Sequence, residues 1–230
     1  MSDSLYQTYN FKGRNEQVCS IAAQNGAASH HILIIPPLFA EMNKLRRNMM
    51  AMARQLSAHN IQCSIADLPG TNESLSLLKN QDFTSWKAAL ESCADILDIS
   101  HVIAFRGGAL IDDIASAKPH LRINPVKGAN IIKTMMRSKI IAQKEAGIEI
   151  SFTELSNAAK KHGTELAGYH ISAQMFADLQ NSEPLPLTNV QEVRIGDEIE
   201  GEALWMRSEP GYDAHMAQSM ADYIFAWCNQ

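Results

Sequence analysis

Cysteine is scarce in this sequence, and the few cysteines form no recognisable pattern. The chain of 230 residues has four of them, Cys19, Cys63, Cys93 and Cys228, with no C-x-x-C pair. No Cys/His cluster has the spacing of a zinc site, and the His30-His31 pair has no third ligand nearby, so we expect no bound metal. Widely spaced single thiols are typical of a reducing compartment, and we expect a cytoplasmic protein.

The sequence also lacks a strong charge of one sign and a long apolar run. Its net charge of -5 excludes the strongly basic class of nucleic-acid-binding proteins. No apolar run approaches the ~20 residues of a membrane helix, and the N-terminus has no secretory signal pattern. With 46% hydrophobic and 20% charged residues, the chain is ordinary for a globular protein. We therefore expect one domain over 1–230, without a membrane span, a nucleic-acid partner or a cofactor.

Strand and helix patterns alternate along the first half of the chain. The apolar run Ile32-Leu33-Ile34-Ile35 is stopped by two prolines, which is typical of a buried parallel strand. Further strands are predicted over 17–22, 61–66, 101–105 and 121–124, and helices over 42–56 and 83–97, the second capped by Asp82. This alternation predicts an α/β fold with a mostly parallel sheet between two helical layers. Ligands bind such sheets beyond the carboxyl ends of the strands.

Residues 128–181 differ from this alternation. The pattern predicts helices over 128–146 and 153–162, a short strand over 164–169, and a third helix capped by Ser172. We interpret this segment as a small, atypical lid. After a connector at 181–186, two late strands over 190–195 and 203–207 and a final helix from about Asp213 complete the prediction.

Arg106 occupies the most informative position in the chain. The strand 101–105 breaks there into Gly107-Gly108, which is the layout of the nucleophile elbow of α/β-hydrolases, G-x-Nuc-x-G. In this pattern Ala104 is the first small residue, Arg106 the nucleophile and Gly108 the last. Arginine is always charged and only donates hydrogen bonds, so it cannot attack a carbonyl. The sequence predicts an α/β-hydrolase-like three-layer sandwich without a nucleophile.

The remaining members of a catalytic triad are weak in this sequence. Asp197 follows a late strand but also fits a simple hairpin turn, and His215 falls at the start of the final helix. Loss of a serine nucleophile costs about 10⁶ in turnover. We therefore do not expect a Ser-His-Asp mechanism.

A guanidinium at this turn has two open uses. Backbone N–H groups and the start of a following helix would join Arg106 in gripping a carboxylate or phosphate. A buried arginine also needs an internal partner, and Glu41 and Glu209 follow strands at the same edge of the sheet. The two uses are compatible. The other residues expected at the ligand site are Gly107 and Phe39, with Asn43 as a polar anchor.

Four stretches resemble one known family. They are 36–47 (PPLFAEMNKLRR), 67–74 (DLPGTNES), 105–109 (FRGGA) and 204–211 (LWMRSEPG). Together they resemble the exosortase A system-associated hydrolases, type 2, which are α/β-hydrolase-like proteins of bacterial exopolysaccharide and protein-sorting gene clusters. The resemblance covers 32–145 and 200–228 and implies an arginine at the elbow. Asn72 stands where the family has a glycine, and 204–211 would be its closing strand and loop.

Three functions follow as hypotheses. The first is a protein that binds a small anionic or acyl-bearing ligand at Arg106 and has no esterase turnover. The alternative is an ester or thioester hydrolase in which Glu41 or Glu209 activates a water molecule. The third is a partner protein whose apolar helix over 128–146 forms a homodimer interface. Lys44, Arg46 and Arg47 fit a solvated helix face.

Overall fold

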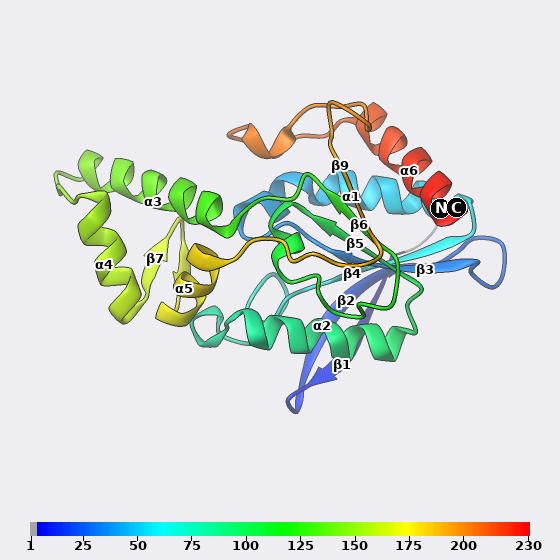
Figure 1. Cartoon of the computed structure of the whole chain (residues 1–230), viewed down its shortest axis with the longest axis horizontal. Coiled ribbons are helices and arrows are strands. Elements are labelled where there is room, and N and C mark those ends of the chain that lie inside the picture. The colour runs from blue at the N-terminus through cyan, green and yellow to red at the C-terminus, as the bar shows by residue number, and fades with distance from the viewer. Residues whose placement is uncertain (1–3) are drawn as a thin grey trace.

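A seven-stranded sheet forms the centre of the protein, which we describe from a computed structural model over residues 4–230 (Figure 1). The strand order is β1-β2-β4-β3-β5-β6-β9. The strands are β1 (Ser4–Phe11), β2 (Arg14–Ile21), β3 (His30–Ile35), β4 (Ile61–Ala66), β5 (His101–Phe105), β6 (His120–Ile123) and β9 (Val190–Val193). β3, β4, β5, β6 and β9 run parallel, whereas β1 and β2 form an antiparallel hairpin at one edge. The expected α/β fold is confirmed.

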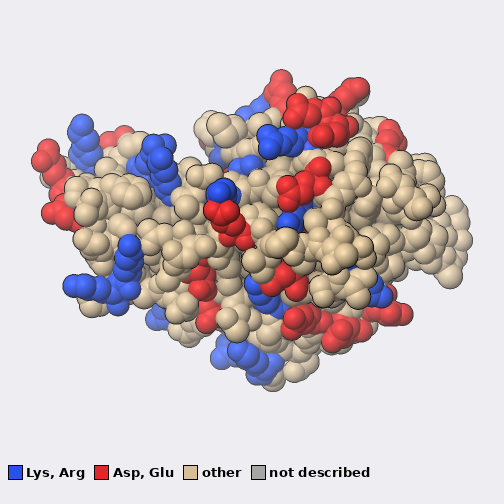
Figure 2. Space-filling model, in the orientation of Figure 1, with Lys and Arg blue, Asp and Glu red and all other residues tan. Residues whose placement is uncertain are grey.

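Helices cover both faces of the sheet. On one face lie α1 (Ala40–Ala58) and α6 (Ala214–Cys228), and on the other lies α2 (Phe83–Leu97). The side chains of β3 alternate between these layers, because successive residues of a strand point to opposite faces. Ile32 and Ile34 pack with α1, and Leu33 and Ile35 pack with α2. Acidic and basic side chains are interspersed over the face shown in Figure 2.

The predicted helix caps at Asp82 and Ser172 are confirmed, and Asp213, near which a helix was expected to begin, is a third cap. Asp82 accepts a hydrogen bond from the Ser85 backbone at the start of α2, and the Ser85 side chain returns one, which makes a capping box. Ser172 caps α5 (Ala173–Asn181), and Asp213 caps α6, in each case through the N–H three residues later. A cap joins residues three positions apart, so the sequence alone is sufficient to predict it.

The 128–181 segment forms a group of elements beside the sheet. It consists of α3 (Gly128–Glu145), α4 (Phe152–His162), the hairpin of β7 (Thr164–Leu166) and β8 (Tyr169–Ile171), and α5 (Figure 1). The single strand expected over 164–169 is therefore two short strands around a turn at Ala167-Gly168. The apolar face of α3, formed by Ile131, Ile132, Met135 and Met136, is buried inside the chain, whereas Ile141 is exposed.

One strand was not predicted, and two elements were predicted wrongly. β1 was not predicted, although it pairs with β2 along its whole length. The stretch 203–207 is not a strand, because Leu204–Met206 forms a 3₁₀ helix. The helix expected after the elbow is also a 3₁₀ helix, Arg106–Leu110. Such a short turn has little of the aligned dipole of an α-helix, so the anion site cannot depend on it.

Candidate functional site

Arg106 pairs with Glu41 where β5 and β3 end. Its Nε donates to Glu41 Oε2 and its Nη2 to Oε1, each at 3.1 Å. Nη1 donates to the carbonyl oxygen of Asn124 at 3.3 Å. The pair is accessible to solvent, with 15% of the Arg106 side chain and 25% of the Glu41 side chain exposed. Of the two predicted partners, the structure selects Glu41.

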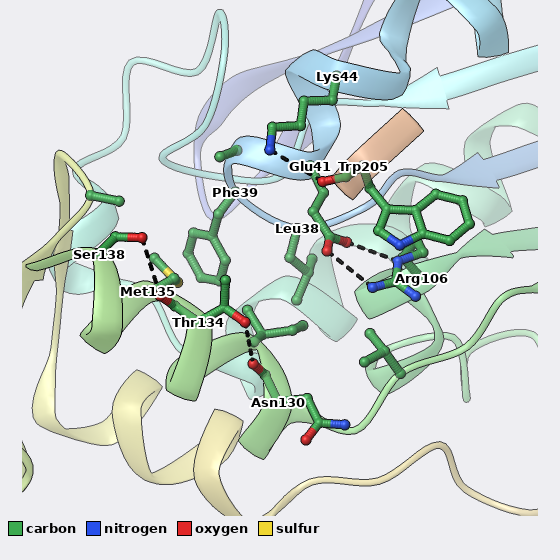
Figure 3. A pocket seen from close by; sticks show the side chains of 14 residues that line it. Leu38, Phe39, Glu41, Lys44, Arg106, Asn130, Thr134, Met135, Ser138 and Trp205 are labelled. Carbon is green, nitrogen blue, oxygen red and sulfur yellow. Dashed lines mark hydrogen bonds and ion pairs between the residues drawn. The ribbon is translucent and has the colours of Figure 1, made fainter. Parts of the chain in front are cut away.

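The guanidinium of Arg106 also stacks on an indole ring. Its Cζ lies 4.5 Å from the ring centroid of Trp205, within the range of a cation–π contact (Figure 3). The carbonyl oxygen of Trp205 accepts a hydrogen bond from Lys44 Nζ at 3.2 Å. Trp205 therefore contacts both Arg106 and Lys44, and these contacts hold the two cationic side chains close to the same residue.

Arg106 and two other non-glycine residues at this edge of the sheet have positive φ angles. They follow three neighbouring strands: Phe39 after β3 (φ 56°), Arg106 after β5 (φ 52°) and Asn124 after β6 (φ 49°). Such conformations cost about 1–3 kcal/mol each and concentrate at functional sites. Arg106 at the elbow has the strained turn that the nucleophile of an α/β-hydrolase adopts.

A cavity of about 200 Å³ opens beside the Arg106–Glu41 pair (Figure 3). Its charged lining consists of Arg106, Lys44 and Glu41. The opposite wall comes from α3 and from Ala167 in the β7–β8 turn, where the residues are Asn130, Ile131, Thr134, Met135 and Ser138. The cavity thus lies between the carboxyl ends of the strands and the 128–181 segment, which is where the fold predicts a ligand.

Two of the polar side chains of α3 in this wall are occupied by their own helix. Thr134 donates to the carbonyl of Asn130 at 3.0 Å, and Ser138 donates to that of Thr134 at 3.2 Å. The exposed amide of Asn130 and the two cations remain available to a ligand. A guanidinium has five N–H donors, and the three contacts of Arg106 leave some of them free.

The predicted site residues are only partly brought together. Phe39 lines the cavity with Arg106, but Asn43 is exposed and lines a different cavity. Gly107 is buried, and a side chain there would meet Ile131 Cδ1 at 2.6 Å, so its role is close packing of the elbow against α3.

Of the weak candidates for catalysis, Glu41 lies at Arg106, whereas Glu209 and His215 do not line the cavity. Glu209 is exposed and is not among the residues that line the cavity. His215 is 72% exposed at the start of α6 and lies 3.3 Å from Glu200, so it cannot serve as a base at the elbow. Asp197 is exposed in the turn after β9. Neither His215 nor Asp197 lines the cavity beside Arg106, so these residues complete no triad at the elbow.

Lys44 and Trp205 line the cavity, but the sequence did not predict them as site residues. Lys44 was assigned to a solvated face, yet it follows Glu41 by three residues on α1, a spacing that places both on one side of a helix. Trp205 belongs to a stretch that was expected to be a strand. Helical spacing could have identified Lys44, whereas no local signal pointed to Trp205.

Among the described residues, no group of three His, Cys, Asp or Glu side chains is arranged to hold a metal ion. All four cysteines are free and buried. None of the helices in residues 4–230 combines the length and the apolar character needed to cross a membrane.

Comparison with known proteins shows the fold alone. No protein-family model and no curated protein matches the sequence. Est1E from Butyrivibrio proteoclasticus, solved with ferulic acid bound, is similar over 97% of this chain and 100% of its own, with a TM-score of 0.64 and 13% identity. A protein from Agrobacterium vitis S4 assigned as a hydrolase is similar over 97% and 98%, with a TM-score of 0.52 and 11% identity. The chain therefore has the α/β-hydrolase fold.

Proposed function

We propose that the protein binds a small ligand with an anionic group and an acyl or other apolar part in the cavity beside Arg106, without a Ser-His-Asp mechanism. One observation carries this proposal: two cations, Arg106 and Lys44, face a largely apolar cavity against a single carboxylate, Glu41. A carboxylate on the ligand would take the free N–H donors of Arg106 and approach Lys44. Charge-assisted hydrogen bonds of this kind contribute about 1.5–3 kcal/mol each.

The 128–181 segment acts as the lid of this site in the proposal. Five residues of α3 and Ala167 of the β7–β8 turn supply one wall of the cavity, so the ligand would lie between the segment and the sheet. The resemblance of residues 36–47 and 204–211 supports a role in a bacterial exosortase or exopolysaccharide system. That cellular context is tested by the genes that neighbour the one encoding this chain.

The test is a calorimetric titration with butanoate and with ferulic acid, the compound bound to Est1E. We expect Arg106→Gln to weaken binding at least tenfold, because it removes the charge-assisted hydrogen bonds. Arg54→Gln is the matched control, since Arg54 is exposed on α1 and does not line the cavity. Equal affinity of the two variants would contradict the proposal.

The alternative is hydrolysis by a water molecule that Glu41 activates. It is favoured by Glu41 being the only carboxylate of residues 4–230 that lines the cavity. It is disfavoured by the hydrogen bonds from Arg106 that both Glu41 oxygens accept. We expect no turnover of p-nitrophenyl acetate or butyrate above the uncatalysed rate, in the natural protein or in Arg106→Ser. Turnover that disappears in Glu41→Gln would establish the alternative instead.

A further inference from the structure

A second cavity of about 290 Å³ lies on the other side of Phe39. Its wall is rich in large apolar groups, which include Met42, Leu68, Trp86 and Tyr169. Asn43, Thr71 and Asn72 also line this cavity; the Thr71 hydroxyl donates to the Leu68 carbonyl, Asn72 Nδ2 to Asp67 Oδ1, and Trp86 Nε1 to the Pro69 carbonyl. No charged side chain of residues 4–230 lines the second cavity, so it has no counterpart to Arg106 and Lys44, and its wall of Met42, Leu68, Trp86 and Tyr169 can take an apolar group.

The two cavities share a wall. Leu38 and Phe39 line both of them, and the β7–β8 turn contributes Ala167 to the first and Tyr169 to the second. The ring of Phe39 packs edge-on against Tyr169, with 5.3 Å between ring centroids, and at 6.0 Å from Trp86. One aromatic side chain thus stands between a cationic compartment and an apolar one.

The backbone of Phe39 is unusual for a residue that only fills space. Its φ of 56° and ψ of -135° lie close to a region that is essentially restricted to glycine. No side chain caps α1 at this position, and the Phe39 carbonyl accepts only a backbone hydrogen bond, from the Met42 N–H at 3.0 Å. The strain holds the ring between the cavities, at a cost that a structural phenylalanine in an ordinary conformation would avoid.

We propose that the two cavities are compartments of one site and that Phe39 is the gate between them. The ligand class is a carboxylate with an extended apolar tail, such as a medium-chain fatty acid. The carboxylate would lie at Arg106 and Lys44, and the tail would pass Phe39 and lie among Leu68, Trp86 and Tyr169. This inference depends on the proposed function for the carboxylate end and adds the tail and the gate.

The first test is a titration of the natural protein with straight-chain carboxylates from butanoate to decanoate. Each methylene that enters an apolar compartment should tighten binding roughly fourfold, the factor that corresponds to the transfer of one buried CH₂. If butanoate binds and Arg106→Gln loses it, but decanoate binds no more tightly, the second compartment is refuted while the proposed function stands. If neither carboxylate binds, both proposals fail.

The position of the tail can be tested with brominated ligands, because bromine quenches a tryptophan that it touches. We expect 10-bromodecanoate to quench Trp86, and the quenching to be lost in Trp86→Phe. Trp227→Phe is the matched control, because Trp227 lies on α6, outside both cavities. Quenching that survives Trp86→Phe would overturn the assignment of the tail.

The gate is tested by Phe39→Gly, since glycine adopts the observed backbone conformation at little cost. Stopped-flow association of decanoate should be faster in this variant than in the natural protein. Equal association rates for decanoate in the two proteins would refute the gate. If Phe39→Gly does not fold, the chain-length series and the bromine test still show whether the two cavities form one site.

Discussion

At the scale of single residues, unusual backbone conformations and buried charge mark the same edge of the sheet. Asn72 illustrates this, because it stands where the resembling family has a glycine and has a φ of 44°. Asparagine tolerates the left-handed conformation better than most residues. Its Nδ2 also donates to Asp67 Oδ1 at 2.7 Å, a bond that glycine could not make. The departure from the family pattern is thus accommodated in both backbone and side chain.

Asp67 gives a prediction about pH. The side chain is 3% exposed, and burial raises the pKa of its carboxyl despite the hydrogen bond from Asn72 and the nearby Arg46. The folded state therefore binds the proton more tightly than the unfolded state. The free energy of unfolding should fall as pH rises from the usual Asp range, about 3.9, through the raised pKa.

Asp67→Asn should remove this fall in the free energy of unfolding with rising pH, and its amide oxygen can still accept the hydrogen bond from Asn72. The difference in unfolding free energy between variant and natural protein should grow with pH over that window and then level off. Urea denaturation at a series of pH values measures it. Asp95→Asn, on the exposed side of α2, is the matched control. A difference that does not depend on pH would show that Asp67 is not the responsible group.

At the scale of elements, the elbow after β5 is defined by how closely its backbone approaches its neighbours. A Cβ on Gly108 would lie 2.7 Å from the Pro36 carbonyl oxygen and 2.8 Å from that of Ile35. A Cβ on Gly107 would meet side-chain atoms instead, Ile131 Cδ1 at 2.6 Å and Leu38 Cγ at 3.0 Å. Gly108 therefore lies against rigid backbone at the end of β3, whereas Gly107 lies against flexible side chains.

Gly108→Ala should destabilise the protein by about 1–3 kcal/mol, because backbone atoms at a strand end cannot move aside. Gly107→Ala should cost less, because the side chains of α3 and Leu38 can shift. Chemical denaturation of the two variants, compared with the natural protein, measures both costs. An equal or reversed order would mean that the elbow is looser than the contacts indicate.

At the scale of the whole molecule, one apolar core joins the sheet to the 128–181 segment. Leu33 and Val102 of the sheet belong to the same cluster as Leu155 of α4 and Phe176 and Leu179 of α5. Within the segment, α3 and α5 are closely packed, since a Cβ on Gly128 would lie 2.1 Å from the Leu179 carbonyl oxygen. The segment therefore shares its buried surface with the main body, as the expectation of a single domain requires.

A shared core predicts one cooperative unfolding transition. Differential scanning calorimetry should give a single peak whose calorimetric and van't Hoff enthalpies agree. Limited proteolysis in the loop 146–151, followed by the same scan, is the companion experiment. Two separated peaks would instead show that 128–181 unfolds by itself and would contradict the single-domain prediction. The expected homodimer stays a prediction, which light scattering tests.

The sequence by itself determined what depends on near neighbours in the chain. The apolar run of β3, the caps at Asp82 and Ser172, and the elbow at Arg106 all follow from residues a few positions apart. β1 and the 3₁₀ helix at Leu204–Met206 were missed because local patterning does not distinguish them from loop or strand. Their conformation depends on pairing and packing partners elsewhere in the chain.

Only the tertiary structure decided what surrounds Arg106. Glu41 rather than Glu209 became its partner, Trp205 came to lie on its guanidinium, and Lys44 turned towards the same cavity. Glu41 and Trp205 are 65 and 99 residues away from Arg106 in the chain, and they meet it because the parallel strands end at a common edge. The sequence therefore determined that a permanent positive charge, Arg106, stands at the elbow, and the sheet brought together the residues that determine what Arg106 can bind.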